Sequence, residues 1–153
     1  LKSFNEDRLL KNYKNINFYD HQGSHWSPLC VHLDMWNKIG GFSEEFNPGI
    51  GSDPDFNMKL WNNGVRIFKG LNDFKVYHFA SLTTRKNIKV IQNRGDNTFL
   101  KKWGFTIKFF KKFYMRTNTR YKGPLSEPDK NFLFYLNLLG CKIKLIYLNL
   151  FNK

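Results

Sequence analysis

Two carboxylates separated by one residue, Asp53 and Asp55, stand at the start of a helical pattern in the sequence. Ser52 is a favourable N-cap residue, Asp55 three positions later completes a capping box, and Gly64 is typical of the residue just after a helix. The sequence therefore predicts a helix over 53–63. At about 100° per residue, Asp53 projects onto the apolar face of this helix and Asp55 onto the opposite face.

A carboxylate that points with apolar side chains is costly to bury without a partner, which makes Asp53 a candidate for chemistry. An aspartate in the first turn of a helix is ordinary, because the helix dipole favours it, but an aspartate that points inward there is less ordinary. The alternative is that both aspartates only cap the helix, and their spacing alone leaves that alternative open.

Three other motifs surround this pair in a fixed order. Gly-Gly-Phe precedes it at 40–42, and Tyr-His-Phe at 77–79 and Lys-Trp-Gly at 102–104 follow it. Together with Ser-Asp-Pro-Asp-Phe at 52–56, this arrangement resembles the acceptor-side half of the family 2 glycosyltransferases, which have the GT-A fold. Many members have Glu-Asp-x-Asp-Leu at the helix start, and some subgroups have the Ser-Asp-Pro-Asp-Phe found here. The resemblance covers about residues 20–125.

The resemblance assigns roles to particular residues. Asp53 matches the catalytic base of the family and Asp55 its second acidic position. Gly40 and Gly41 would let a substrate approach the backbone, and Trp26 opens the segment that lies beside the sugars. The residues themselves leave another interpretation open, because two glycines also suit a helix C-cap and a tight turn.

The resemblance also implies a divalent metal, Mn²⁺ or Mg²⁺, with His78 as one ligand. A basic loop at 80–89 would close over the donor diphosphate, and its candidate donors are Ser81, Arg85 and Lys86, since hydroxyl, guanidinium and ammonium groups bind phosphate oxygens. From the residues alone, a histidine at the end of a strand is more often structural, and the loop could equally be a solvated basic segment.

The expected fold class is α/β, a partial GT-A fold with a small mixed sheet, flanking helices and a helical C-terminal extension. Apolar runs and alternating side chains predict strands at 26–32, 64–70 and 73–79. Periodic patterns that end at glycine or turn residues predict helices at 6–13, 34–39, 97–104, 106–115 and 132–151.

A complete GT-A domain needs a nucleotide-binding half that ends in an Asp-x-Asp motif, and no such motif precedes Gly40. We therefore interpret residues 1–125 as the C-terminal half of a glycosyltransferase domain and 126–153 as a helical extension. The expected reaction is an inverting transfer of a sugar from a nucleotide-sugar donor to a hydroxyl of a carbohydrate or lipid-linked acceptor, in cell-surface polysaccharide or glycoconjugate synthesis. This chain alone is expected to be inactive.

The chain is strongly basic, with 25 Lys and Arg residues against 12 Asp and Glu residues and a net charge of +13. An alternative function is therefore a non-catalytic binding module for anionic membrane or nucleic acid. No nucleic-acid-binding motif is present, so we expect no nucleic acid as partner. A membrane module alone would leave the acidic pair and His78 unexplained.

The C-terminal segment 132–151 is apolar but contains Gly140, Lys142 and Lys144. We interpret it as too interrupted to span a membrane. It could lie on an anionic surface or pack on the catalytic domain, and its composition fits both. The expected location is cytoplasmic, with peripheral membrane contact. Cys30 and Cys141 have no metal-ligand spacing, so both are expected to be reduced thiols.

Overall fold

The computed structural model describes residues 4–15, 19–47, 49–74, 76–77 and 94–151. In these ranges the helices are α1 (Glu6–Asn12), α2 (Leu33–Ile39), α3 (Ser52–Asn62), α5 (Gly95–Trp103), α6 (Ile107–Phe109) and α7 (Phe132–Phe151). Two 3-10 turns, η1 (Tyr13–Asn15) and η2 (Glu44–Phe46), and a π-helical turn, η3 (Phe110–Tyr114), accompany them. The strands are β1 (His21–Gln22) and β2 (Lys69–Gly70).

The expectation of a mixed α/β fold is confirmed for the described residues, which form six α-helices and one two-stranded sheet. The strands are antiparallel, with His21 opposite Gly70 and Gln22 opposite Lys69. This sheet is smaller than expected and uses β1, at a position where the sequence predicts no strand. Two residues in each strand give little independent stability, so helix packing must hold this fold together.

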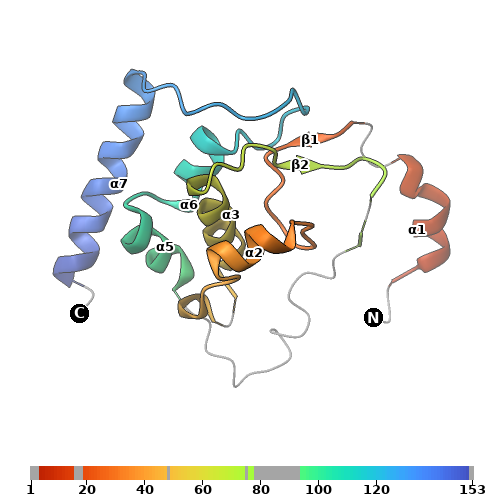
Figure 1. Ribbon diagram of the computed structural model, residues 1–153, viewed down its shortest axis with the longest axis horizontal. Coiled ribbons are helices and arrows are strands. Elements are labelled where there is room, and N and C mark those ends of the chain that lie inside the picture. The colour runs from red at the N-terminus through yellow and green to blue at the C-terminus, as the bar shows by residue number, and fades with distance from the viewer. Residues whose placement is uncertain (1–3, 16–18, 48, 75, 78–93, 152–153) are drawn as a thin grey trace.

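Helix α3 lies at the centre of the molecule, with α2, α5 and α6 around it and the strand pair beside it (Figure 1). Five consecutive residues of α3, 54–58, are buried, and so are Leu60 and Trp61. Phenylalanine rings from segments before and after α3 in the sequence complete the core: Phe46, Phe68, Phe99, Phe105, Phe109, Phe110 and Phe134. The helix that carries both candidate aspartates is therefore surrounded on most sides rather than half exposed.

Glycines end the helices where the sequence predicted it. Gly40 after α2, Gly64 after α3 and Gly104 after α5 all have positive φ, at 71°, 87° and 77°. Glycine takes the left-handed conformation without the steric cost of a side chain, so each of these residues lets the chain turn away at once. The boundaries of α2, α3 and α5 are accordingly close to the expected ones.

The strands expected at 26–32 and 73–79 are wrong for the described residues. Residues 26–32 form bends and extended chain without a pairing partner, although Leu29 and Val31 pack against the core. In the described part of 73–79, Phe74 and Val76 are exposed and no strand forms. A short apolar run can bury its side chains without pairing its backbone, which is why such runs are ambiguous. Of the run 64–70, only β2 is a strand.

The helical segments near the C-terminus follow the expectation with one change. The segment predicted as a helix at 106–115 begins as α6 and continues as the π-helical turn η3. Helix α7 has the expected bounds and contacts α5 and α6. It is long and apolar enough to cross a membrane by length and composition alone, so the interpretation that it is too interrupted to span stays a prediction. Core helices of soluble proteins pass the same test.

Candidate functional site

The N-terminus of α3 differs from the capping box that the sequence predicted. The cap position belongs to Gly51, which has φ of 89° and whose carbonyl accepts the first helical hydrogen bond from Asp55 N at 3.1 Å. Ser52 lies inside the helix, and its Oγ donates to Gly49 O at 2.7 Å. Gly51 packs against Phe46, where a Cβ would lie 2.8 Å from a ring carbon. A tight glycine turn therefore replaces the side-chain cap.

Asp53 is half-buried and is oriented by the loop before α2. Ser27 Oγ donates a hydrogen bond to Asp53 Oδ1 at 2.8 Å. Asn57 Nδ2 donates to the backbone carbonyls of Asp53 at 2.7 Å and His25 at 3.2 Å, which ties α3 to the same loop. The sequence did not identify Ser27, because a serine 26 positions away in the chain gives no signal in a helical pattern.

Asp55 is the buried carboxylate of the pair, with 0% of its surface exposed, which corrects the prediction that it points away. Ser43 Oγ donates to its Oδ2 at 2.7 Å, and Trp103 Nε1 donates to its Oδ1 at 2.8 Å. Lys102 Nζ forms an ion pair with Oδ1 at 2.9 Å. The projection failed because it assumed one buried face, whereas α3 is packed on several sides.

Lys102 links this carboxylate to a wider group that we call the Asp55 cluster: Ser43, Glu45, Asp55, Lys59, Lys102 and Trp103. Its ammonium also pairs with Glu45 and donates to Ser43 Oγ at 3.1 Å. Burial opposes the charge on Lys102, but hydrogen bonds to Glu45 and Asp55 outweigh it and raise the pKa of Lys102. Burial lowers the pKa of Lys59 at the edge of the cluster, and Lys102 adds to this effect.

The Asp55 cluster joins two of the sequence motifs, because Asp55 belongs to Ser-Asp-Pro-Asp-Phe and both Lys102 and Trp103 to Lys-Trp-Gly. The two motifs are 48 residues apart between Asp55 and Trp103. Their joint occurrence in the sequence was the only signal that linked the two motifs before the structure was known. A buried charge needs hydrogen-bond donors and a counter-charge, and here it has three donors of which one is charged.

His25 and Trp26 form the side of the site next to Ser27. His25 is buried, and its Nδ1 lies 2.9 Å from Gly23 O, where a neutral imidazole donates. Burial lowers the pKa of His25; the Gly23 hydrogen bond and Asp53 oppose this, while Lys111 adds to it. The structure shows no hydrogen bond from the described residues to His25 Nε2.

Trp26 is the exposed aromatic side chain of this region, with 57% of its surface accessible. Its ring contacts His25, with centroids 4.6 Å apart, and Lys111 Nζ lies 5.2 Å from its centroid. An exposed indole beside a half-buried carboxylate can present an apolar platform to a ligand whose hydroxyl groups reach the polar side.

Gly40 and Gly41 have clear structural roles. Gly40 ends α2 and has open space where a Cβ would be. Gly41 has φ of 60°, and a Cβ on it would lie 2.7 Å from Cζ2 of Trp36. The interpretation as a helix end and a tight turn is therefore confirmed. Their proposed contact with substrate remains a prediction.

Four of the predicted site residues, His78, Ser81, Arg85 and Lys86, lie outside the described residues. We predict that the side chains of His78 and Asp53 lie within roughly 10 Å of each other, because both must flank one small cavity. Among the residues that the structure describes, no group of three His, Cys, Asp or Glu side chains could hold a metal ion. The carboxylate of Asp55 is already bound by Ser43, Lys102 and Trp103, so Asp55 itself is not free to act as a metal ligand.

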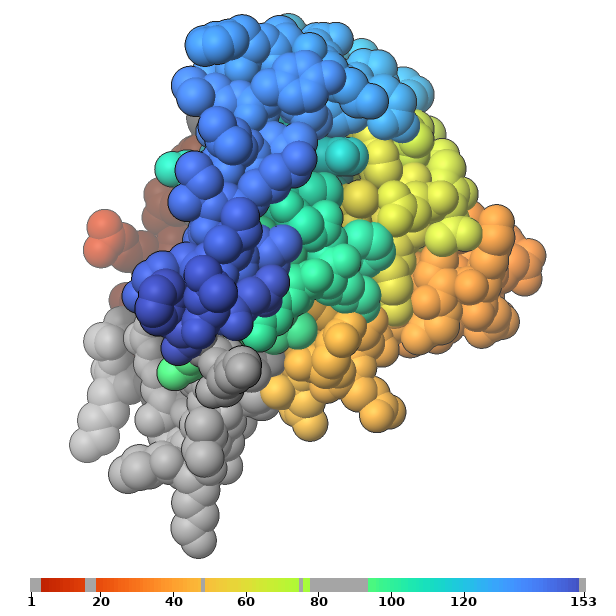
Figure 2. Space-filling view, turned by 90° about the vertical axis from the view of Figure 1, so that its left-hand side faces the viewer, coloured from red at the N-terminus to blue at the C-terminus, as the bar shows by residue number. Residues whose placement is uncertain are grey.

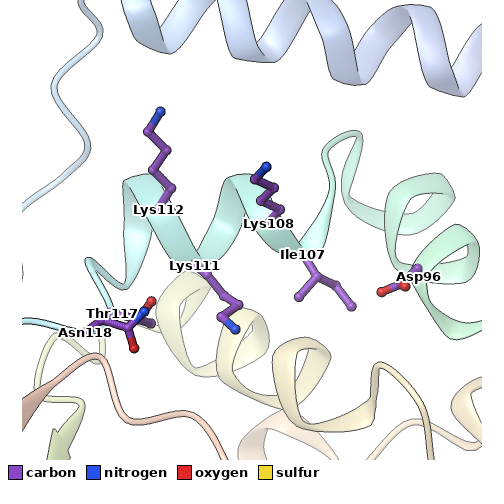
Figure 3. Close-up of a pocket in the computed structure, with 7 residues that line it drawn as sticks. All are labelled: Asp96, Ile107, Lys108, Lys111, Lys112, Thr117 and Asn118. Carbon is purple, nitrogen blue, oxygen red and sulfur yellow. The ribbon is translucent and has the colours of Figure 1, made fainter.

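A surface hollow of about 470 Å³ lies next to this region. It is lined by Asp96, Ile107, Lys108, Lys111, Lys112, Thr117 and Asn118, and Asp53 is not among its lining residues. In Figure 3 Lys111 points toward α3, whereas Lys108 and Lys112 point away from it. Lys111 is therefore the residue that joins the hollow to Trp26, and the three ammonium groups do not converge on one point.

Comparisons of this chain with models of protein families, with curated proteins and with solved structures found no match.

Proposed function

We propose that this chain is the acceptor-side part of a GT-A glycosyltransferase that transfers a sugar from a nucleotide-sugar donor with inversion. The observation that carries the proposal is the environment of Asp53. Its carboxylate lies at the N-terminus of α3, is held by Ser27 and lies near the exposed Trp26. The two aspartates have different environments, and only Asp53 is partly open to solvent.

Asp53 is the residue that we assign as general base. Ser27 occupies Oδ1, and the structure shows no hydrogen bond from the described residues to Oδ2. An acceptor hydroxyl that donates to Oδ2 would be oriented for attack and would lose its proton to the carboxylate as the new bond forms.

Asp55 has a different role in this proposal, because its carboxylate is enclosed by its own partners. We assign it to positioning: it fixes α3 against α5 and thereby sets the place of Asp53. This changes its expected contribution from direct chemistry to the stability of the site. Trp26 is the assigned platform for an acceptor sugar, whose apolar C–H face can rest on the indole.

The donor side of the proposal depends on residues outside the described part of the chain. His78 and the basic loop with Ser81, Arg85 and Lys86 keep their assigned roles toward a divalent metal and the donor diphosphate. The metal would stabilise the charge on the leaving diphosphate. An Asp-x-Asp motif of the nucleotide-binding half, which does not occur before Gly40 in this chain, would share that metal, so this chain alone is expected to be inactive. The acceptor class stays a carbohydrate or a lipid-linked saccharide.

The proposal is tested by titrating the chain with soluble saccharides and following backbone and indole N–H signals by NMR. We expect weak binding, with shifts at Trp26, Ser27 and Asp53 and none in α1, which lies far from this site (Figure 1). Trp26→Ala should abolish these shifts, whereas Trp26→Phe should keep part of them. Shifts that cluster elsewhere, or an unchanged titration of Trp26→Ala, would contradict the assignment of this site.

A further inference from the structure

Helix α7 presents one apolar face to the rest of the protein. Phe134, Cys141 and Leu148, at intervals of seven residues, are its buried side chains. Leu138 and Leu145 lie between them and are partly buried against the same core. The ring of Phe134 contacts Phe109 and Phe113, with centroids 5.0 and 5.2 Å apart. This inner face therefore attaches α7 to α6 and η3.

A second apolar face lies on the opposite side of α7 and is exposed. Its residues alternate in steps of four and three, and each has more than half of its surface accessible: Phe132, Leu136, Leu139, Ile143, Ile146 and Leu150. Tyr135 and Tyr147 are also exposed beside them. Within the apolar 18-residue stretch of α7, only 17% is buried. Figure 2 shows the helix as a ridge across this face of the molecule.

The boundaries between the two faces carry the lysines of α7. At about 100° per residue, Lys142 and Lys144 project to opposite flanks, about 80° and about 120° from the centre of the outer face. Both are exposed. A lysine in this position can bury its aliphatic stem against an apolar environment and extend its ammonium to the level of phosphate groups. No acidic residue occurs after Asp129.

We propose that the outer face of α7 docks on an anionic lipid surface, with the helix lying in the plane of the interface. The outer apolar side chains would enter the acyl boundary, and Lys142 and Lys144 would contact the lipid phosphates on either side. Lys108 and Lys112, next to the phenylalanines that contact Phe134, point toward the side where α7 runs in Figure 3. The net charge of +13 attracts the whole chain to such a surface.

The contacts of α7 favour a helix that lies on the lipid surface over a helix that spans the bilayer. The inner face of α7 is already packed on the protein, so a spanning position would require that packing to separate. Lys142 and Lys144 lie near the middle of the helix, where a spanning orientation would place both charges in hydrocarbon.

The outer face of α7 also favours lipid over a second copy of the chain. With its tyrosines, Leu133 and Phe151, the outer apolar sector is about 160° wide at 100° per residue, broader than the narrow seam of a two-stranded coiled coil. In a dimer formed through this face, Lys142 and Lys144 of the two copies would lie beside the interface with no acidic residue of α7 to pair with. Residues that flank a helix–helix interface normally form ion pairs across it.

The test measures binding of the chain to vesicles of phosphatidylcholine alone and to vesicles mixed with phosphatidylglycerol. We expect clear cosedimentation with the mixed vesicles only, weakened by added salt because these charges are exposed. Lys142→Gln with Lys144→Gln should lower the affinity by about 30-fold, at roughly fivefold for each charge. Leu139→Ser with Ile143→Ser should lower it at least about tenfold, since two inserted side chains are lost.

The matched control is Ile67→Ser with Leu71→Ser, which removes two side chains that are equally exposed but lie outside α7. It should bind vesicles as the unmodified chain does. Equal binding to neutral and mixed vesicles would overturn the proposal, as would an outer-face variant that binds like the control. Sedimentation of the chain as a dimer that the outer-face variant dissociates would assign this face to a second copy instead.

Discussion

Replacement of Asp55 by alanine is expected to lower the free energy of unfolding by about 3–5 kcal/mol, because it removes one partner of a buried ion pair. Asp55 has no exposed surface, and its loss leaves Trp103 Nε1, Ser43 Oγ and Lys102 Nζ without their acceptor. The side chain of Lys102 is 27% exposed and still reaches Glu45, so the effect should lie at the lower end of this range.

Urea unfolding followed by circular dichroism measures this change, and two variants serve as comparison. Asp55→Asn keeps an acceptor for Trp103 but loses the charge, so it should cost less, about 1–3 kcal/mol. Asp129→Ala removes an exposed aspartate and should stay within about 0.5 kcal/mol. If Asp55→Ala were no more destabilising than Asp129→Ala, the Asp55 cluster would not hold the site together.

Asp53→Asn is expected to lower the turnover of the active protein by about 10²–10⁴, the usual loss when a positioned general base is removed. In our proposal, activity requires this chain together with a nucleotide-binding half, so the variant is measured in a protein that joins the two. The amide is nearly the same size as the carboxylate and still accepts the hydrogen bond from Ser27 through its oxygen. It cannot accept the proton of the acceptor hydroxyl. Fold and donor affinity should therefore remain unchanged.

Initial rates of sugar transfer at saturating donor, together with thermal unfolding of the same preparations, separate chemistry from stability. Ser27→Ala is the informative second variant, because it removes the donor that orients Asp53 while leaving the carboxylate. It should reduce turnover less than Asp53→Asn does. Near-normal turnover of Asp53→Asn would remove Asp53 from the role of base, and the enclosed position of Asp55 offers no ready substitute.

The helices could be predicted from the sequence because local signals define them. Gly40, Gly64 and Gly104 end three of them, and at each position the structure has the left-handed backbone that glycine favours. The strands could not be predicted in the same way. Leu29 and Val31 are apolar because they pack on the core, not because their backbone pairs with a neighbour.

The orientation of the two aspartates could not be read from helical periodicity. A helical projection separates the apolar face of a helix from its polar face. Asp55 is nevertheless buried, because Trp103 lies against it and donates a hydrogen bond to its carboxylate. The position of Trp103 beside α3 depends on the tertiary fold. The same limit applies to Ser27, whose contact with Asp53 joins a loop to a helix. The candidate residues could thus be found from sequence motifs, whereas their partners required the structure.

The anomeric configuration of the product tests the central claim most directly. This chain, joined to a nucleotide-binding half, is incubated with nucleotide sugars and saccharide acceptors, and the product is examined by proton NMR. We predict transfer with inversion, because in our proposal Asp53 activates the acceptor for attack on the face opposite the leaving diphosphate. Transfer with retention, or a folded protein that transfers no sugar from any donor of a full panel, would contradict the account.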